Sequence, residues 1–161
     1  MTLYESILER LRSQHLGIFQ LVNDLQEEDL REKKENEWSM QEHLVHLAVY
    51  QPRFVHRLQD ILNQESPEFE PYIPHHDPLF QEYLQMDWYD VWLRLVERRD
   101  DLIQVITALQ PSQLQRIGIH ARYGKMTLLE WIEFFLLHES HHTYKIFMLR
   151  KQVHQNKLVL E

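Results

Sequence analysis

Apolar residues recur at steps of three and four along most of the chain, which is the spacing of an amphipathic α-helix. Four long segments carry this pattern and are expected to be helices, covering residues 2–25, 40–63, 88–109 and 128–151. One face of the first segment collects Tyr4, Leu8, Leu11, His15, Ile18, Val22 and Leu25. The last segment is the most apolar of the four.

The segments that separate the first three helices interrupt the pattern in different ways. Residues 27–37 are acidic and lack an apolar stripe, so we expect a solvated loop there. Ser39 followed by Glu42 forms a capping box, which predicts the start of the second helix. Residues 65–78 contain four prolines and are expected to form a loop. A loop of this length often covers a functional site.

The last connection and the overall pattern complete the expected fold. Residues 112–125 contain Gly118 and Gly124 and should be irregular, and Thr127 is a good N-cap for the final helix. The chain shows no internal repeat and no low-complexity tract. The pattern therefore predicts an all-α fold, a four-helix bundle that forms a single domain over residues 1–161.

Composition narrows the chemistry that this bundle can perform. The chain has 161 residues with eleven histidines and no cysteine, and the histidine content is several times the average. Without cysteine there is no disulfide framework, no thiolate zinc site and no cysteine nucleophile. A metal would have to be held by imidazole and carboxylate groups. The absence of cysteine also agrees with a reducing cytoplasm, where we expect the protein to reside.

Charge and hydropathy exclude two classes of partner. The chain carries 17 Lys and Arg against 25 Asp and Glu, and its formal charge of −8 opposes a phosphate backbone. We therefore expect no nucleic-acid partner. No run of about eighteen apolar residues occurs, so we expect neither a signal peptide nor a membrane span.

The strongest chemical signal lies in the last expected helix. His138 and His142 are four residues apart, so their imidazoles share one helix face and can reach one metal ion. A third ligand must come from another helix, and His46 of the second expected helix is the best placed. Three neutral imidazoles leave a coordination position open for water or substrate. The spacing alone leaves His141 as a competitor of His142, and histidines on an apolar face are often ordinary core residues.

The segment from His138 to His142 also matches the His-Glu-x-x-His pattern of zinc proteases, in which Glu139 would be the general base. The longer form of that pattern needs a third histidine where this chain has Met148. The nineteen residues after His142 are too few to supply a second helix with a Glu ligand. We interpret the match as accidental.

Two segments together resemble the DinB-like family of bacterial metalloenzymes. The first, which resembles the second-helix motif of that family, is Trp38-Ser39-x-x-Glu42-x-Leu44-x-His46-Leu47. The second, which resembles its last helix, is His120-x-x-Tyr123-Gly124-x-Met126-Thr127-Leu128 followed by His138-Glu139-x-His141-His142. The likeness extends over essentially the whole chain. It implies a bundle that holds a divalent metal, nickel or zinc, through His46, His138 and His142, and it favours His142 over His141.

The resemblance also implies a small-molecule substrate. Characterised relatives include transferases and isomerases that use low-molecular-weight thiols such as bacillithiol or mycothiol, and relatives are often homodimers. A three-histidine site can activate a water molecule, as in a hydrolase, or bind a thiol as thiolate, as in an S-transferase. In this chain the thiol would come from a cosubstrate. Tyr144 and Lys145 stand where many relatives carry a Gly-Gln pair, so the substrate of any one relative does not transfer.

The alternative function is a non-catalytic helical bundle that holds a structural metal and acts as a dimeric binding module. Under the enzymatic hypothesis, Glu42 is a candidate catalytic base, although it also fits a role in the capping box alone. His15, His120 and Arg122 are candidates to line the pocket, with Arg122 placed to receive a substrate carboxylate. For His15, a buried structural role is the competing interpretation.

Overall fold

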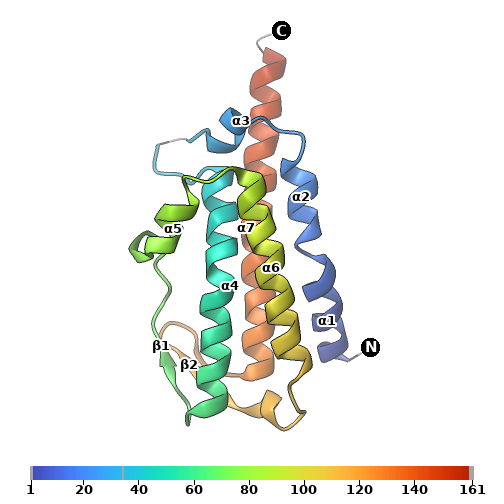
Figure 1. Ribbon diagram of the computed structural model, residues 1–161, viewed down its shortest axis with the longest axis vertical. Helices are drawn as coiled ribbons and strands as arrows, with labels where there is room; N and C mark the ends of the chain where they lie inside the picture. The colour runs from blue at the N-terminus through green and yellow to red at the C-terminus, as the bar shows by residue number, and fades with distance from the viewer. Residues whose placement is uncertain (1, 34, 160–161) are drawn as a thin grey trace.

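Four helical rods run side by side along the long axis of the computed structural model, which describes residues 2–33 and 35–159 (Figure 1). One rod consists of two helices placed end to end, α1 (Leu3–Ser13) and α2 (Leu16–Val22). The other rods are α4 (Met40–Asn63), α6 (Trp88–Thr107) and α7 (Leu128–Val159). The central helix α4 packs against both α6 and α7. The helical bundle predicted from the hydrophobic spacing is confirmed.

The first rod differs from the unbroken helix expected over residues 2–25. Between α1 and α2 the amide of Gly17 donates to the carbonyl of Gln14 at 3.2 Å, and that of Ile18 donates to His15 at 3.0 Å. These bonds span three residues instead of four, so the turn is tighter than an α-helix. The apolar face continues through the break, and for this reason the hydrophobic spacing does not reveal it.

The connection from the first rod to α4 is also more regular than the expected loop. Residues Glu27–Arg31 form the short helix α3, and its single buried residue is Leu30. One apolar side chain in one helical turn produces no stripe, which is why the segment looks like a loop in the sequence. The capping box is confirmed: the Ser39 amide donates to the Glu42 carboxylate at 2.7 Å, and the Glu42 amide donates to the Ser39 hydroxyl at 3.1 Å.

A small three-stranded sheet corrects the expectation of a strictly all-α fold. Its strands are β1 (Glu68–Phe69), β2 (Ile117–His120) and β3 (Gly124–Thr127), with β1 parallel and β3 antiparallel to the central β2. The region 112–125, expected to be irregular, therefore contains most of this sheet. A strand of two residues that pairs with a segment some fifty positions away leaves no local pattern to detect.

Gly118 shows how closely the sheet approaches the bundle. A Cβ atom at this position would lie 2.7 Å from Cδ1 of Ile61 on α4 and 2.8 Å from Nε1 of Trp131 on α7. No larger residue fits without displacing one of these two side chains. The sheet is thus fixed against the end of α4 and α7 that Figure 1 shows beside β1 and β2.

The proline-rich segment after α4 runs along the outside of that helix. It carries β1, a 3₁₀ turn at Pro74–His76 and then α5 (Pro78–Tyr83). Asp77 ties the segment to α4, because its carboxylate accepts hydrogen bonds from Arg53 at 2.9 Å and from the Tyr72 hydroxyl at 2.9 Å. This attachment holds Tyr72 against the bundle.

A buried polar layer divides the apolar core into two clusters. The side chain of Arg99 on α6 forms an ion pair with Glu139 on α7, and both are almost completely buried. Arg99 also donates from Nε to the side chain of Gln51 at 2.7 Å, and Gln14 donates to Glu139 at 3.0 Å. The layer therefore joins all four rods through one hydrogen-bonded network. No helix in the described part of the chain is long and apolar enough to cross a membrane.

Candidate metal centre

Three imidazoles meet between α4 and α7. His46 comes from α4, and His138 and His142 come from α7. Nε2 of His138 lies 2.9 Å from Nε2 of His46 and 3.1 Å from Nε2 of His142. One nitrogen from each of the three residues falls within 4.8 Å of the others. The structure thus brings together the three residues predicted from the sequence, and their arrangement fits a metal site.

The hydrogen-bonding capacity of this cluster agrees with a bound cation. In zinc sites the metal–nitrogen distance is about 2.0–2.1 Å, which places tetrahedral ligand nitrogens about 3.4 Å apart, close to the observed separations. A proton shared between two Nε2 atoms satisfies one contact, whereas a cation satisfies all three lone pairs. The Nδ1 atoms of His46 and His138 are buried and have no hydrogen-bond partner among the described residues. A cation bound at the Nε2 atoms leaves the ring protons on these two Nδ1 atoms, so the cation accounts for the three Nε2 lone pairs and not for the Nδ1 atoms.

Burial keeps the three imidazoles in the form that binds metals. It lowers the pKa of His46 to about 2 and that of His138 to about 4, with a further contribution from neighbouring histidines. Burial also lowers the pKa of His142. Metals bind the neutral imidazole, so the cluster offers three ligands at neutral pH without first losing protons.

A fourth histidine, which sequence reasoning missed, supports the cluster from behind. Nδ1 of His43 on α4 lies 2.8 Å from Nδ1 of His142. Because His142 directs Nε2 toward the cluster, its Nδ1 can carry the proton and donate it to His43. The spacing of three residues places His43 and His46 on neighbouring parts of one helix face, but the contact of His43 with His142 also depends on how α4 packs against α7.

Aromatic rings enclose the cluster. The half-buried ring of Trp38 lies 5.3 Å from the ring of His46 and 5.9 Å from that of His142. The ring of Tyr50 lies 4.8 Å from His138, and the ring of Tyr72 lies 5.7 Å from His46. The proline-rich segment, expected to cover a site, thus contributes Tyr72 to the wall. These rings restrict the access of water to the three imidazoles.

The hydroxyls of Tyr50 and Tyr72 have different partners. That of Tyr50 accepts a hydrogen bond from Arg57 at 3.3 Å, which leaves its own proton free to donate. Burial raises the pKa of Tyr50, so the hydroxyl stays protonated. The Tyr72 hydroxyl donates to Asp77, and burial together with this carboxylate raises the pKa of Tyr72. Of these two hydroxyls, that of Tyr50 is therefore the one available to donate a hydrogen bond beside the cluster.

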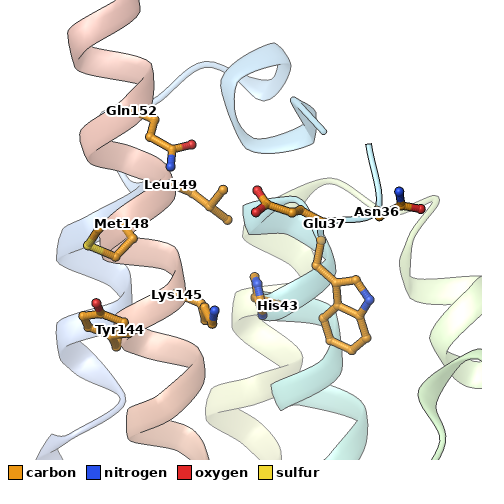
Figure 2. A pocket seen from close by; sticks show the side chains of 9 residues that line it. Asn36, Glu37, His43, Tyr144, Lys145, Met148, Leu149 and Gln152 are labelled. Atoms are coloured by element: carbon orange, nitrogen blue, oxygen red, sulfur yellow. The ribbon is translucent and has the colours of Figure 1, made fainter. Parts of the chain in front are cut away.

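The cluster lies between two cavities. One of about 410 Å³ is lined by His43, Trp38 and residues of α7, and Figure 2 shows Lys145 facing His43 across the gap between the two helices. The other, of about 210 Å³, is lined directly by His46 and His138. Its other lining residues are Tyr50, Arg57, Pro71, Tyr72, His120, Arg122, Tyr123 and Phe134. Two of the three candidate ligands are therefore reached through the smaller cavity.

The remaining candidates fall into two groups. His120 and Arg122 line the smaller cavity, as considered from the sequence. His15 does not: it is buried against Trp92 and Arg99, 5.9 Å from the Trp92 ring. His141 is exposed, although its ring lies 5.3 Å from that of His142.

The two acidic candidates have other partners. The carboxylate of Glu42 caps α4 and also accepts from Lys33 at 2.7 Å, so the catalytic role expected for Glu42 stays a prediction. Glu139, the general base of the protease pattern, is paired with Arg99 in the core. It follows His138 directly on the helix and points to a different side of α7. The protease pattern therefore lacks its base at the histidine cluster.

The fold and the site place this protein in the class of helical bundles that have a candidate three-histidine metal centre between two of their helices. The chain belongs to the DinB superfamily, whose family model matches residues 9–146. Among solved structures, the fold resembles YfiT from Bacillus subtilis with a TM-score of 0.82 and 18% sequence identity, over 93% of this chain and 87% of that one. YfiT is described as a probable metal-dependent hydrolase with an unusual four-helix bundle topology. No curated protein matches the chain at a significant level.

Proposed function

We propose that the protein is a metal-dependent enzyme that hydrolyses a small molecule, with a divalent metal, nickel or zinc, held by His46, His138 and His142. The observation that carries the proposal is the meeting of three imidazoles, two buried and one half-buried, of which His46 and His138 line a cavity. The description of YfiT as a probable metal-dependent hydrolase also supports the proposal. A metal bound by three histidines supplies a Lewis acid with an open position for a water molecule or a substrate atom.

The side chains around the site have separate roles in this proposal. Tyr50 donates a hydrogen bond from its hydroxyl to negative charge that develops on the substrate, and Arg57 orients that hydroxyl. Trp38 and Tyr72 exclude water from the imidazoles. His43 accepts the Nδ1 proton of His142 and so fixes the orientation of its ring.

The second candidate function is the transfer of a low-molecular-weight thiol. It is favoured by the two cavities on either side of the cluster, because a transferase needs room for a thiol and for its acceptor. The chain has no cysteine of its own, so the thiol would enter as a cosubstrate. A dimeric binding module with a structural metal remains the non-enzymatic alternative, and the homodimer and the cytoplasmic location remain predictions.

Activity measurements on metal-free and metal-loaded protein test the proposal. The wild type is assayed with small esters, lactones and amides, and separately with glutathione, bacillithiol or coenzyme A plus an electrophile. We expect turnover in one panel that requires metal and is abolished by His138→Ala. The matched control is His141→Ala, an exposed histidine on the same helix, which should leave turnover unchanged. If His138→Ala loses its metal but keeps the full activity of the wild type, the proposal is wrong.

A further inference from the structure

The smaller cavity beside the histidine cluster has a positive lining. Its charged residues are Arg57, from the second half of α4, and Arg122, from the turn between β2 and β3. No carboxylate is among its described lining residues. Its other polar groups are the hydroxyls of tyrosines and the imidazoles of His46, His120 and His138. A chain with a formal charge of −8 thus places two cations and no carboxylate among the described lining residues of this cavity.

Neither arginine forms an ion pair with an acidic residue in the described parts of the chain. Arg53, one turn before Arg57 on the same helix, shows the contrast, because it is paired with Asp77 at 2.9 Å. The guanidinium of Arg57 uses two of its five N–H groups, donating to the carbonyl of Glu70 at 2.6 Å and to the hydroxyl of Tyr50 at 3.3 Å. The remaining donors are available to a ligand.

Arg57 is held in place by its surroundings. Its guanidinium carbon lies 5.5 Å from the centre of the Phe69 ring and 5.8 Å from that of Trp131, within the range of cation–π contacts. Arg57 lines the same cavity as His46 and His138 of the cluster. The arginine is therefore oriented before any ligand binds and lies within electrostatic reach of a candidate metal ligand.

Arg122 completes the pair from the exposed side. Its backbone amide donates to Nδ1 of His120 at 3.0 Å, which fixes the turn that carries it. Its guanidinium carbon lies 5.4 Å from the centre of the Tyr123 ring. The side chain is exposed, so this cation lies where the cavity meets solvent.

We propose that the cavity binds a small molecule bearing an oxyanion, a carboxylate or a phosphate, through Arg57 and Arg122. Guanidinium groups pair with the two oxygens of such anions in a fixed geometry. The volume of about 210 Å³ lies below the roughly 300–1,000 Å³ of drug-sized ligand pockets, so the bound part is small. The assignment of this ligand as the substrate rests on the proposed function, whereas oxyanion binding itself does not require the metal.

Nuclear magnetic resonance titration of the full chain, with and without zinc, tests the site. The probes are succinate, inorganic phosphate and succinamide, the uncharged analogue of succinate. We expect succinate or phosphate to shift the Nε–H signals of Arg57 and Arg122, and to bind both forms of the protein. Binding of succinate alone assigns a carboxylate, and binding of phosphate alone assigns a phosphate. If succinamide binds as tightly as succinate and phosphate does not bind, the charge is irrelevant and the proposal is wrong.

Variants separate the arginine site from direct binding to the metal. Arg122→Gln should raise the dissociation constant of the anion about tenfold or more, as expected for a lost charge-assisted hydrogen bond. Arg94→Gln, on α6 and outside the cavity, makes the same change in charge and should have no effect. Arg57→Gln should resemble Arg122→Gln, and if it fails to fold, Arg122→Gln decides alone. Unchanged affinity in Arg122→Gln overturns the proposal, whereas absence of metal binding would overturn only the proposed function.

Discussion

The imidazoles of His43 and His142 meet through their Nδ1 atoms at 2.8 Å, on the side of His142 that faces away from the other two candidate ligands. Hydrogen bonds of this kind orient metal-binding histidines and fix their tautomer. A metal bound at Nε2 of His142 would place the ring proton on Nδ1, where His43 can accept it. His43 is therefore a positioning residue for the candidate metal site.

Replacing His43 tests this relationship. His43→Phe keeps an aromatic ring but removes the acceptor, and we expect metal affinity to fall about 10–100-fold. His43→Asn places an amide oxygen near the former Nδ1 and should restore most of the affinity. Competition with a chromophoric chelator measures both, with His141→Ala as the control. Equal affinity in the wild type and in His43→Phe would show that His43 does not orient His142.

Glu139 is predicted to act in folding and not in chemistry. Glu139→Ala leaves the guanidinium of Arg99 buried without its partner, which typically costs about 3–5 kcal/mol of unfolding free energy. Glu133 lies on the same helix as Glu139, and Glu133→Ala, which breaks its partly exposed pair with Arg10 of α1, should cost about 1 kcal/mol or less. Urea denaturation measures both. A Glu139→Ala protein that is as stable as the wild type but inactive would restore the protease pattern as a candidate mechanism.

Tyr50 is predicted to contribute to turnover without affecting metal content. Tyr50→Phe keeps the ring beside His138 and removes the hydroxyl, so kcat should fall about a hundredfold, as for other lost donors to developing negative charge. Tyr72→Phe is the matched control, because its hydroxyl is already bonded to Asp77. Steady-state kinetics with metal analysis of each variant provide the comparison. Unchanged kcat in Tyr50→Phe would remove this tyrosine from the mechanism.

His15 makes folding sensitive to acid. Burial, followed by the charge of Arg99, lowers the pKa of His15 from 6.5 to about 4. Between these pH values the unfolded chain binds a proton at His15 that the folded protein excludes. The contribution of His15 to the free energy of unfolding is therefore fully present above about pH 6.5 and is lost as the pH falls toward 4. The pKa difference corresponds to about 3 kcal/mol.

The variant His15→Asn isolates this contribution. An asparagine retains an acceptor for Arg99 but does not titrate, so the fall in unfolding free energy between pH 7 and pH 4.5 should be smaller than in the wild type. Denaturant titrations of metal-free protein at several pH values give both curves, and the other buried histidines affect them equally. Parallel curves for the two proteins would contradict the role given to His15.

Local sequence patterns predicted much of this fold. The capping box of Ser39 and Glu42 and the apolar faces of the long helices depend on residues a few positions apart, and all were found as expected. The pairing of β1 with β2 depends instead on distant segments, so the sheet was not anticipated. The break at His15 was hidden because its apolar face is continuous.

The candidate site also combines features that local patterns predicted with features that depend on distant parts of the chain. The spacing of His138 and His142, together with the family resemblance that includes His46, identified three residues that the structure brings together. Their action as metal ligands stays a prediction. To predict the contact of His43 with His142, one must know how α4 is rotated relative to α7, and the spacing within one helix does not give this rotation. Tyr72 comes from the proline-rich segment, and its position depends on the bonds of Asp77.

The most direct test of the account is the metal stoichiometry of protein purified without an affinity tag. Inductively coupled plasma mass spectrometry is applied after equilibration with nickel or zinc and removal of free metal. We predict about one equivalent in the wild type and in His141→Ala, and less than about a tenth of an equivalent in a folded His138→Ala protein. Wild-type protein that takes up neither metal, or a His138→Ala protein that binds as much as the wild type, would contradict the three-histidine metal centre.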